Sequence, residues 1–385
     1  MIKVGIDDIN FYTPPFSLDL TTLSKARGLD LLELSNITGQ RQISICPPDE
    51  DVVTMAANAA YPLLENIEKN QIELLLFATE SGIDQSKAAG IYVHQLLDLP
   101  KRCRVIELKQ ACYGATAGLQ LAKALLQQYP DKKALLIASD IARYELNTSA
   151  EPSQGAGAVA MLLTANPRLA SIQPDAGFYT EDAMDFWRPN YRREAFVDGR
   201  LSCDLYIKVL KETWQQYSSL TGSQLSDYNY FCYHTPIPRL VETAHKRLTR
   251  SSERQALDYA LQYSRVTGNC YTASLYIGLV SLLDHCPQDL AKQSIGMYSY
   301  GSGCTGEFFA ITVEPQYQRT LRTKCHQTLL DNRQPLNYEQ YVQFYQFPTH
   351  PTNGHALDYP SYTNGRFRLT GIHQHKRVYK NTNIK

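Results

Sequence analysis

Short apolar runs, each followed by a turn of small residues and then an amphipathic stretch, recur along the first half of the chain. Such runs are typical of buried strands, and amphipathic stretches are typical of helices that cover a sheet. The expected strands span residues 72–79, 103–108, 134–139 and 156–164, and the expected helices span residues 84–97 and 111–129. This alternation predicts an α/β fold.

The second half of the chain repeats parts of this order. Residues 268–283 resemble residues 111–126, because in both segments small residues open an apolar helix. A strand pair expected over residues 294–313 resembles residues 151–163 in the same way. The similarity is faint, so the sequence leaves both a duplicated and an unduplicated arrangement open.

The length of the chain indicates two halves. A single core stops growing at about 250–300 residues, and this chain has 385. We place the halves at residues 1–166 and 167–385. Residues 178–201 show no clear periodicity and are expected to form connecting loops, and a hairpin is expected over residues 366–379.

Charge and cysteine usage narrow the function. The chain has 38 Lys and Arg against 38 Asp and Glu, and neither sign forms a block, which argues against a nucleic-acid partner. No apolar run approaches the roughly 18 residues of a membrane span. Charged residues in the N-terminal segment MIKVGIDDINFY interrupt what would be the apolar core of a signal peptide. The nine cysteines lack the spacing of metal sites or disulfide scaffolds. We expect a cytoplasmic protein that acts on small molecules, with no metal site and no membrane contact.

Four reactive residue types follow predicted strands, at the edge of an α/β sheet where active sites form. They are Glu80, Cys112, His234 and Ser302. Cys112 lies at the N-terminus of a predicted helix, whose dipole is expected to lower the pKa of the thiol and to stabilise an oxyanion. The alternative is a buried structural cysteine, which is the interpretation we adopt for the other eight.

His234 and Glu80 are candidates for proton transfer. His234 lies in YHTPIP, where Pro236 and Pro238 restrict the backbone after a predicted strand. A lone histidine is more often a loop or core residue. Glu80 follows an apolar strand, where burial would raise its pKa and suit it to act as a base toward carbon. The alternative role for Glu80 is an acid near the N-terminus of the next helix.

Motifs spread over nearly the whole chain surround these residues. They read FATESGIDQSKAAG, ELKQACYGATAGLQLA, ASDIARYELNTSAEPSQGAGAVAM, YTEDAMDFWRP, VDGRLS, YHTPIP, GNCYTASLYIGL and YGSGCTGEFF. Together and in this order they resemble the hydroxymethylglutaryl-CoA synthases, in particular the bacterial members of the mevalonate pathway. The resemblance implies the duplicated five-layer thiolase fold (α-β-α-β-α) and a homodimer.

The resemblance also implies roles for individual residues. Cys112 matches the nucleophile that carries acetyl as a thioester, and Glu80 matches the general acid/base that removes a proton from the acetyl methyl. His234 matches the residue that binds the acetoacetyl group and polarises its ketone. The matched substrate-binding positions are Tyr144, Ser153, Ser202, Asn269 and Ser302 around the acyl groups, and Asp30 and Arg239 toward CoA. Arg239 stands where many relatives have lysine, and it is expected near the nucleotide phosphates.

The implied reaction joins acetyl-CoA to acetoacetyl-CoA, with both thioesters as substrates and no cofactor. The SGID sequence after Glu80 also resembles polyketide-branching relatives, so an acetoacetyl acyl carrier protein stays open as the acceptor. A cysteine hydrolase that uses Cys112 and His234 is a second alternative. A catalytically silent binding protein of the same fold is a third.

Overall fold

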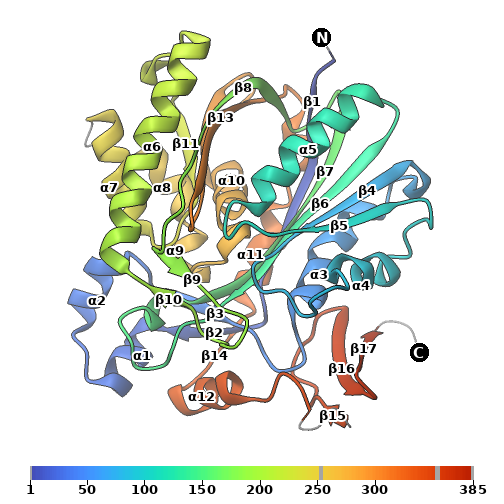
Figure 1. Ribbon diagram of the computed structural model, residues 1–385, viewed down its shortest axis with the longest axis vertical. Helices are drawn as coiled ribbons and strands as arrows, with labels where there is room; N and C mark the ends of the chain where they lie inside the picture. Colours follow the sequence, from blue (N-terminus) through green and yellow to red (C-terminus); the bar gives the residue numbers. More distant parts are fainter. Residues whose placement is uncertain (1, 251–254, 352–355, 383–385) are drawn as a thin grey trace.

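The computed structural model describes residues 2–250, 255–351 and 356–382. Its main sheet has nine strands in the order β11-β12-β13-β8-β1-β7-β6-β4-β5 (Figure 1). The strands are β1 (Val4–Tyr12), β4 (Ile72–Ala78), β5 (Arg104–Leu108), β6 (Lys133–Ala142), β7 (Gly155–Ala165), β8 (Ala170–Thr180), β11 (Tyr230–Tyr233), β12 (Ser294–Gly301) and β13 (Thr305–Val313).

The two ends of this sheet have the same topology. In the first half, β4 pairs parallel with β6, β6 pairs antiparallel with β7, and β7 pairs antiparallel with β1. The second half repeats this pattern: β11 pairs parallel with β12, β12 pairs antiparallel with β13, and β13 pairs antiparallel with β8. The halves meet where β1 pairs with β8 at Gly5↔Ser171 and Ile6↔Ala170. Gly5 is required there, because a Cβ would lie 2.0 Å from the Ala170 carbonyl oxygen.

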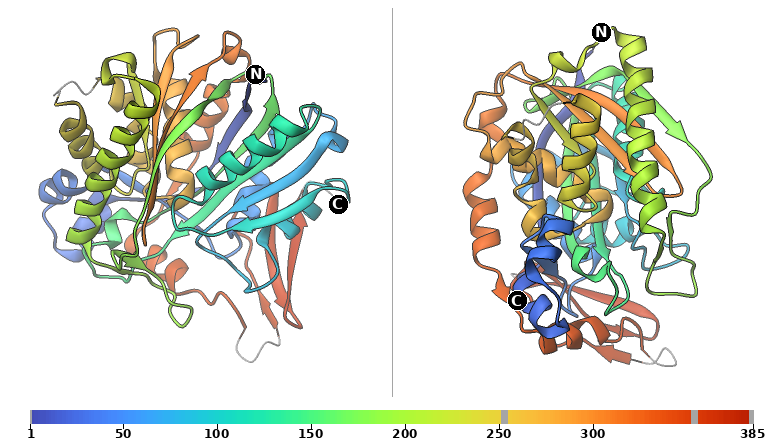
Figure 2. Two further views of the ribbon diagram at one scale, coloured as in Figure 1. Left: turned by 45° about the horizontal axis from the view of Figure 1, so that its top comes forward. Right: turned by 90° about the vertical axis from the view of Figure 1, so that its left-hand side faces the viewer.

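Helices cover both faces of each half and complete five layers. Helices α5 (Gly114–Gln128) and α10 (Ser274–His285) pack between the halves. Helices α3 (Val52–Leu64) and α4 (Ala89–Leu96) cover the outer face of the first half, and α6 (Gly199–Thr221) and α7 (Pro238–Thr249) cover that of the second. In Figure 1, α6 and α7 lie on the left and α4 on the right, and Figure 2 shows the same layers from two other directions.

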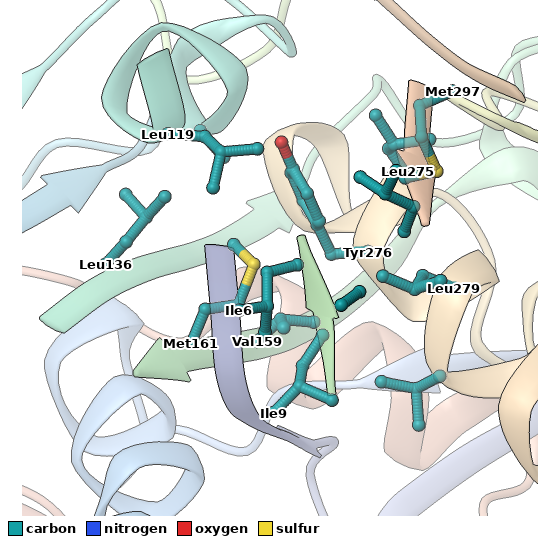
Figure 3. Packing of buried hydrophobic residues seen from close by; sticks show 14 of the residues in the cluster. Ile6, Ile9, Leu119, Leu136, Val159, Met161, Leu275, Tyr276, Leu279 and Met297 are labelled. Atoms are coloured by element: carbon teal, nitrogen blue, oxygen red, sulfur yellow. The ribbon is translucent and has the colours of Figure 1, made fainter. Parts of the chain in front are cut away.

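The central layer is one hydrophobic core shared by both halves (Figure 3). The apolar face of α5, which includes Leu119, packs with Leu136 and Met161 of the first half. Tyr276 and Leu279 of α10 belong to the same cluster. Since helices cover both faces, β6 and β7 are buried almost throughout, as expected for strands inside a layered α/β fold. The predicted α-β-α-β-α arrangement is confirmed.

The remaining elements are helices, strands and 3-10 turns outside the main sheet and the helices named above. They are β2 (Phe16–Asp19), β3 (Gln42–Ile45), β9 (Phe186–Trp187), β10 (Phe196–Val197), β14 (Gln334–Pro335), β15 (Ala356–Asp358), β16 (Phe367–His373), β17 (Lys376–Asn381), α1 (Leu20–Arg27), α2 (Leu31–Thr38), α8 (Gln255–Leu261), α9 (Ser264–Thr267), α11 (Thr323–Asp331), α12 (Tyr338–Gln346) and the 3-10 turns η1 (Lys69–Gln71), η2 (Glu151–Ser153), η3 (Leu225–Asp227), η4 (Tyr271–Ala273) and η5 (Tyr317–Thr320). Among the helices of the described ranges, none is long and apolar enough to cross a membrane.

Most predicted elements agree with the structure, but some differ in extent, and the helix expected over residues 111–129 begins only at Gly114. The helix expected over residues 84–97 begins only at Ala89, and that expected over 268–283 begins at Ser274, after a turn in which Tyr271 has a φ of 43°. Residues 178–201 are not simply loops, because they include the paired strands β9 and β10 and the start of α6. The hairpin expected over 366–379 is confirmed as β16–β17. The division at residues 166 and 167 stays a prediction.

Candidate active site

The site centres on Cys112, in the turn between β5 and α5. We call residues 110–113 the nucleophile turn. Cys112 Sγ donates a hydrogen bond of 2.9 Å to Glu80 Oε1, which comes from the loop after β4. The parallel strands β4 and β5 therefore bring these two predicted residues together at their carboxyl ends, as the sequence indicated.

The second half of the chain packs directly against the nucleophile turn. Gly301, at the end of β12, leaves no space for a Cβ, which would lie 2.6 Å from the Gln110 carbonyl oxygen and 2.7 Å from the Tyr113 nitrogen. Gln110 Nε2 donates to the Ser302 carbonyl oxygen at 3.3 Å. Tyr113 donates to Glu307 of β13 at 2.6 Å. The position of the nucleophile thus depends on contacts between the two halves.

The electrostatic surroundings of Cys112 differ from the prediction. Burial raises the pKa of its thiol well above the usual value, and the carboxylates of Glu80, Asp140 and Asp185 raise it further. The predicted lowering by the helix dipole is therefore wrong, because α5 begins only at Gly114 and burial among acidic groups outweighs its field. The thiol is therefore protonated at rest, and it donates its hydrogen bond to Glu80.

Asp140, on β6, organises the loop that carries Glu80. Its Oδ1 accepts hydrogen bonds from Thr79 Oγ1 (2.8 Å) and from the backbone nitrogens of Glu80 (2.9 Å) and Ser81 (3.0 Å), and its Oδ2 accepts from the Thr272 nitrogen (3.1 Å). Burial raises the pKa of Glu80 to about 8, and the Asp140 charge adds to this effect. A raised pKa agrees with the prediction for Glu80.

His234 follows β11, which runs parallel to β12, so it lies at the same edge of the sheet as Ser302. Its backbone nitrogen donates to the Tyr298 carbonyl oxygen (2.8 Å), and its carbonyl oxygen accepts from Tyr206 Oη (2.7 Å). Burial lowers the pKa of the imidazole to about 3, and Nδ1 is buried without a hydrogen-bond partner. The ring is therefore neutral at pH 7, with a polar atom left for another molecule.

Aromatic side chains surround the sulfur. Tyr144 and Tyr271 pack in one buried cluster with Cys112, and Phe186 packs against it. Asn269 Oδ1 accepts from the Tyr271 nitrogen at 2.9 Å, and the Asn269 nitrogen donates to the Ser153 carbonyl oxygen at 3.1 Å. The predicted residues Tyr144, Ser153 and Asn269 thus belong to one connected wall of the site.

Three predicted substrate residues lie farther out. Asp30 is exposed and caps α2, since its Oδ1 accepts from the Leu32 nitrogen at 2.7 Å. Arg239, in the first turn of α7, donates to the Asn36 carbonyl oxygen at 2.9 Å and pairs with Glu242. Ser202 is half-buried in the first turn of α6. Helix α2 contacts both α7 and the η2 turn of Ser153, so Asp30, Arg239 and Ser153 follow one side of the molecule.

Two family models cover the chain. The model for the N-terminal part of hydroxymethylglutaryl-coenzyme A synthases matches residues 2–168. The model for the C-terminal part matches residues 175–255 and 239–380. The chain belongs to the hydroxymethylglutaryl-CoA synthase family. It is therefore an acyltransferase of the class that forms carbon–carbon bonds.

Relatives and solved structures agree with this membership. The hydroxymethylglutaryl-CoA synthase of Enterococcus faecalis is 39% identical over 99% of this chain and 100% of its own length. The polyketide biosynthesis 3-hydroxy-3-methylglutaryl-ACP synthase PksG of Bacillus subtilis is 36% identical over 89% of this chain and 87% of its own length. A crystal structure of an HMG-CoA synthase complexed with CoA superposes with a TM-score of 0.95 at 35% identity, covering 99% of this chain and 100% of that one. MvaS in complex with 3-hydroxy-3-methylglutaryl coenzyme A gives a TM-score of 0.92 at 32% identity, with both chains covered completely.

Sequence reasoning missed three charged residues of this synthase site. Asp140 is one of them, and its signal is a carboxylate inside the otherwise apolar strand ALLIASDIA. Asp185 and Arg188 lie in the segment expected to be loops, where no periodicity marks them. Asp185 accepts from Tyr300 Oη and the Gly303 nitrogen, both at 2.8 Å, and Arg188 donates to the Glu80 carbonyl oxygen.

The synthase site opens into a cleft of about 1,600 Å³. Glu80, Gln110, Arg188 and Ser302 are among the residues that line it. Cys112 is 8% exposed. In the described ranges, no group of three or more His, Cys, Asp or Glu side chains is placed to hold a metal ion.

Proposed function

We propose that the protein condenses acetyl-CoA with acetoacetyl-CoA and water to give 3-hydroxy-3-methylglutaryl-CoA and CoA, as in the mevalonate pathway. The hydrogen bond between Cys112 and Glu80 carries this proposal, because it places a base beside a nucleophile in a partly buried cleft. Similarity to structures that hold CoA and 3-hydroxy-3-methylglutaryl coenzyme A supports thioester substrates. We further propose a cytoplasmic homodimer that needs no cofactor.

The first step transfers acetyl from CoA to Cys112. The thiol proton of Cys112 ends on the CoA sulfur, which leaves as a thiol, so the step is balanced without an external base. Glu80 then removes a proton from the acetyl methyl, which attacks the ketone of the acceptor while His234 donates to the ketone oxygen. Water finally cleaves the Cys112 thioester and leaves a carboxylate on the product. Asn269, Tyr144 and Ser302 hold the acyl groups in this proposal.

In this proposal, the CoA chain extends from the acyl groups past Ser202 and along the side of the molecule that carries Ser153, Asp30 and Arg239. Support comes from α2, whose exposed Leu32 offers apolar surface beside these polar groups. Arg239 pairs with Glu242 in this structure, so phosphate binding would draw its guanidinium toward the ligand.

The decisive experiment compares Glu80→Ala with Cys112→Ala during brief exposure to acetyl-CoA. Glu80→Ala should gain one acetyl group on Cys112, since removing the carboxylate also removes a charge that raises the pKa of the thiol. It should then form 3-hydroxy-3-methylglutaryl-CoA about 10²- to 10⁴-fold more slowly, because the methyl lacks its base. Cys112→Ala should show neither acetyl adduct nor product. Intact mass and product chromatography measure both.

Three outcomes would contradict the proposal. Loss of acetylation in Glu80→Ala would mean that the glutamate is required for thiolate formation and that the roles are not separable. Acetate release by the parent enzyme without an acceptor would indicate a hydrolase. Turnover with an acetoacetyl acyl carrier protein but not with acetoacetyl-CoA would indicate the polyketide-branching reaction.

A further inference from the structure

Residues 185–188, which we call the strap, cross the site between the two halves of the chain. Asp185 is fully buried and accepts from Tyr300 and Gly303 beside the Ser302 turn. Phe186 packs against the rings of Tyr144 and Tyr271 at centroid distances of 6.1 and 5.7 Å. The strap therefore contacts both the wall of the site that contains Tyr144 and Tyr271 and the end of β12.

The rest of the strap is anchored on its other side. Trp187 pairs with Phe196 across β9 and β10, and their rings stack at 5.3 Å. Arg188 follows β9 directly and donates through Nη2 to the carbonyl oxygen of Glu80. The pairing of β9 with β10 fixes the backbone beside Arg188. The position of the Arg188 guanidinium therefore does not depend on the rigidity of the loop after β4.

The charges that face Glu80 come from several elements. Asp140 of β6 and the Cys112 thiol lie beside its carboxyl group, and the phenols of Tyr144 and Tyr271 interact with it electrostatically. Asp185 adds negative charge at Cys112. Every one of these groups is anionic when it ionises, whereas Arg188 carries a positive charge that favours the ionised form of Glu80.

We propose that Arg188 is a positioning residue for the condensation step: it holds the loop that carries Glu80 and stabilises the ionised carboxylate that abstracts the methyl proton. This inference rests on the proposed role of Glu80 as the base. Burial and Asp140 raise the pKa of Glu80 to about 8, and the Arg188 charge and the Cys112 hydrogen bond counteract them. Once Cys112 is acetylated, its sulfur can no longer donate a hydrogen bond to Glu80. The Arg188 charge then becomes more important for keeping Glu80 ionised during condensation, the step that needs the base.

The test is the pH dependence of condensation by enzyme already acetylated on Cys112. Acetylation removes the thiol from the titration, so the pH midpoint of the condensation rate reports Glu80. An opposite charge within about 4–6 Å lowers the pKa of a carboxyl by about 1–3 units. Arg188→Met should therefore raise the midpoint by about one pH unit and slow condensation about tenfold at pH 7. Arg188→Lys should restore most of the shift, because it keeps the charge.

Arg192→Met is the matched control. Arg192 lines the same cleft, but its guanidinium lies over the Phe196 ring at 4.3 Å and 3.7 Å from Glu145. Its removal should leave the midpoint unchanged. An unchanged midpoint in Arg188→Met, with only a lower maximal rate, would show that Arg188 anchors the loop without acting through charge and would overturn the proposal.

A second readout does not depend on the condensation reaction. The rate at which iodoacetamide alkylates Cys112, mapped by mass spectrometry across pH, reports the Glu80–Cys112 pair in the free enzyme. Arg188→Met should shift this profile upward and Arg188→Lys should not. A shifted alkylation profile in an enzyme that forms no hydroxymethylglutaryl-CoA would reject the proposed function but support the effect of Arg188 on Glu80. An unshifted profile in an enzyme that forms hydroxymethylglutaryl-CoA would support the proposed function and reject that effect.

Discussion

Burial raises the pKa values of both Cys112 and Glu80, and the Cys112 thiol keeps its proton at neutral pH. The Glu80 charge raises the pKa of the thiol further, whereas the hydrogen bond that the thiol donates lowers the pKa of Glu80. Two groups coupled in this way titrate as a pair, so their protonation steps belong to the pair and not to either residue alone. His234 is neutral at pH 7 because burial lowers its pKa. It can therefore donate a hydrogen bond to the substrate without carrying a charge.

His234→Ala should separate acceptor binding from acetylation. The unpartnered Nδ1 of the parent indicates that this ring is reserved for a ligand, and loss of one buried hydrogen bond costs about 1–3 kcal/mol. The variant should accept acetyl on Cys112 at a rate within a few fold of the parent. It should bind acetoacetyl-CoA about 10- to 100-fold more weakly in equilibrium titrations.

His245→Ala is the control for this prediction. His245 is also a histidine with a pKa lowered by burial, to about 4, but its Nδ1 bonds to Tyr233 Oη at 2.8 Å. Its loss should affect stability and not acceptor affinity. Equal acceptor affinity in His234→Ala and the parent would remove His234 from the proposed role.

At the scale of elements, the nucleophile turn is shaped by β12 and β13 rather than by its own sequence. Ala111 has a φ of 43°, which is an uncommon backbone conformation for a residue with a side chain. The close approach of Gly301 and the hydrogen bond from Tyr113 to Glu307 hold the turn from the opposite half. Strand ends from one half therefore set the geometry of a nucleophile that belongs to the other.

Gly301→Ala tests this dependence. The added methyl must displace the backbone of the nucleophile turn, because a Cβ at Gly301 would lie 2.6 Å from the Gln110 carbonyl oxygen. We expect a stability loss of about 1–3 kcal/mol and acetylation of Cys112 about 100-fold slower, as for a displacement of about 1 Å in a reacting group. Denaturant unfolding and single-turnover acetylation measure the two effects.

Gly199→Ala provides the comparison, since a Cβ at Gly199 would meet no atom within 4 Å. It should acetylate at the parental rate. If Gly301→Ala does so too, the turn has room to adjust, and the contact with β12 does not govern the nucleophile.

At the scale of the whole molecule, the two similar halves share one core. Residues of α5 and α10 belong to the same buried cluster, and Thr116 Oγ1 and Tyr276 Oη are 2.8 Å apart across the contact between these helices. The main sheet also continues from β1 to β8. Neither half could expose its inner face to water without losing a large apolar contact.

The two halves should therefore unfold together. Both tryptophans, Trp187 and Trp214, lie after residue 166, so their fluorescence reports the second half, whereas far-ultraviolet circular dichroism reports all helices and strands. In a denaturant titration, the two signals should give coincident transitions. A fluorescence transition clearly separated from the circular dichroism transition would show that the halves are independent folding units.

Much of this architecture could be predicted from local patterns. The strands at residues 72–79 and 156–164 are legible because burial on both faces demands continuous apolar runs, and the similarity of residues 111–126 to 268–283 is matched by the equivalent helices α5 and α10. Cys112, Glu80 and His234 could be identified as candidates because reactive side chains stand out directly after such strands. Their chemical types are properties of the chain itself.

Other features depend on groups brought together from distant parts of the chain. The raised pKa of Cys112 results from burial and from carboxylates on three separate elements, which outweigh the helix dipole predicted from its neighbours. The strap residues Asp185 and Arg188 lie in a segment without periodicity, and their importance comes from contacts with Tyr300 and Glu80. Burial and electrostatic interactions depend on distances through space, and only tertiary folding sets those distances.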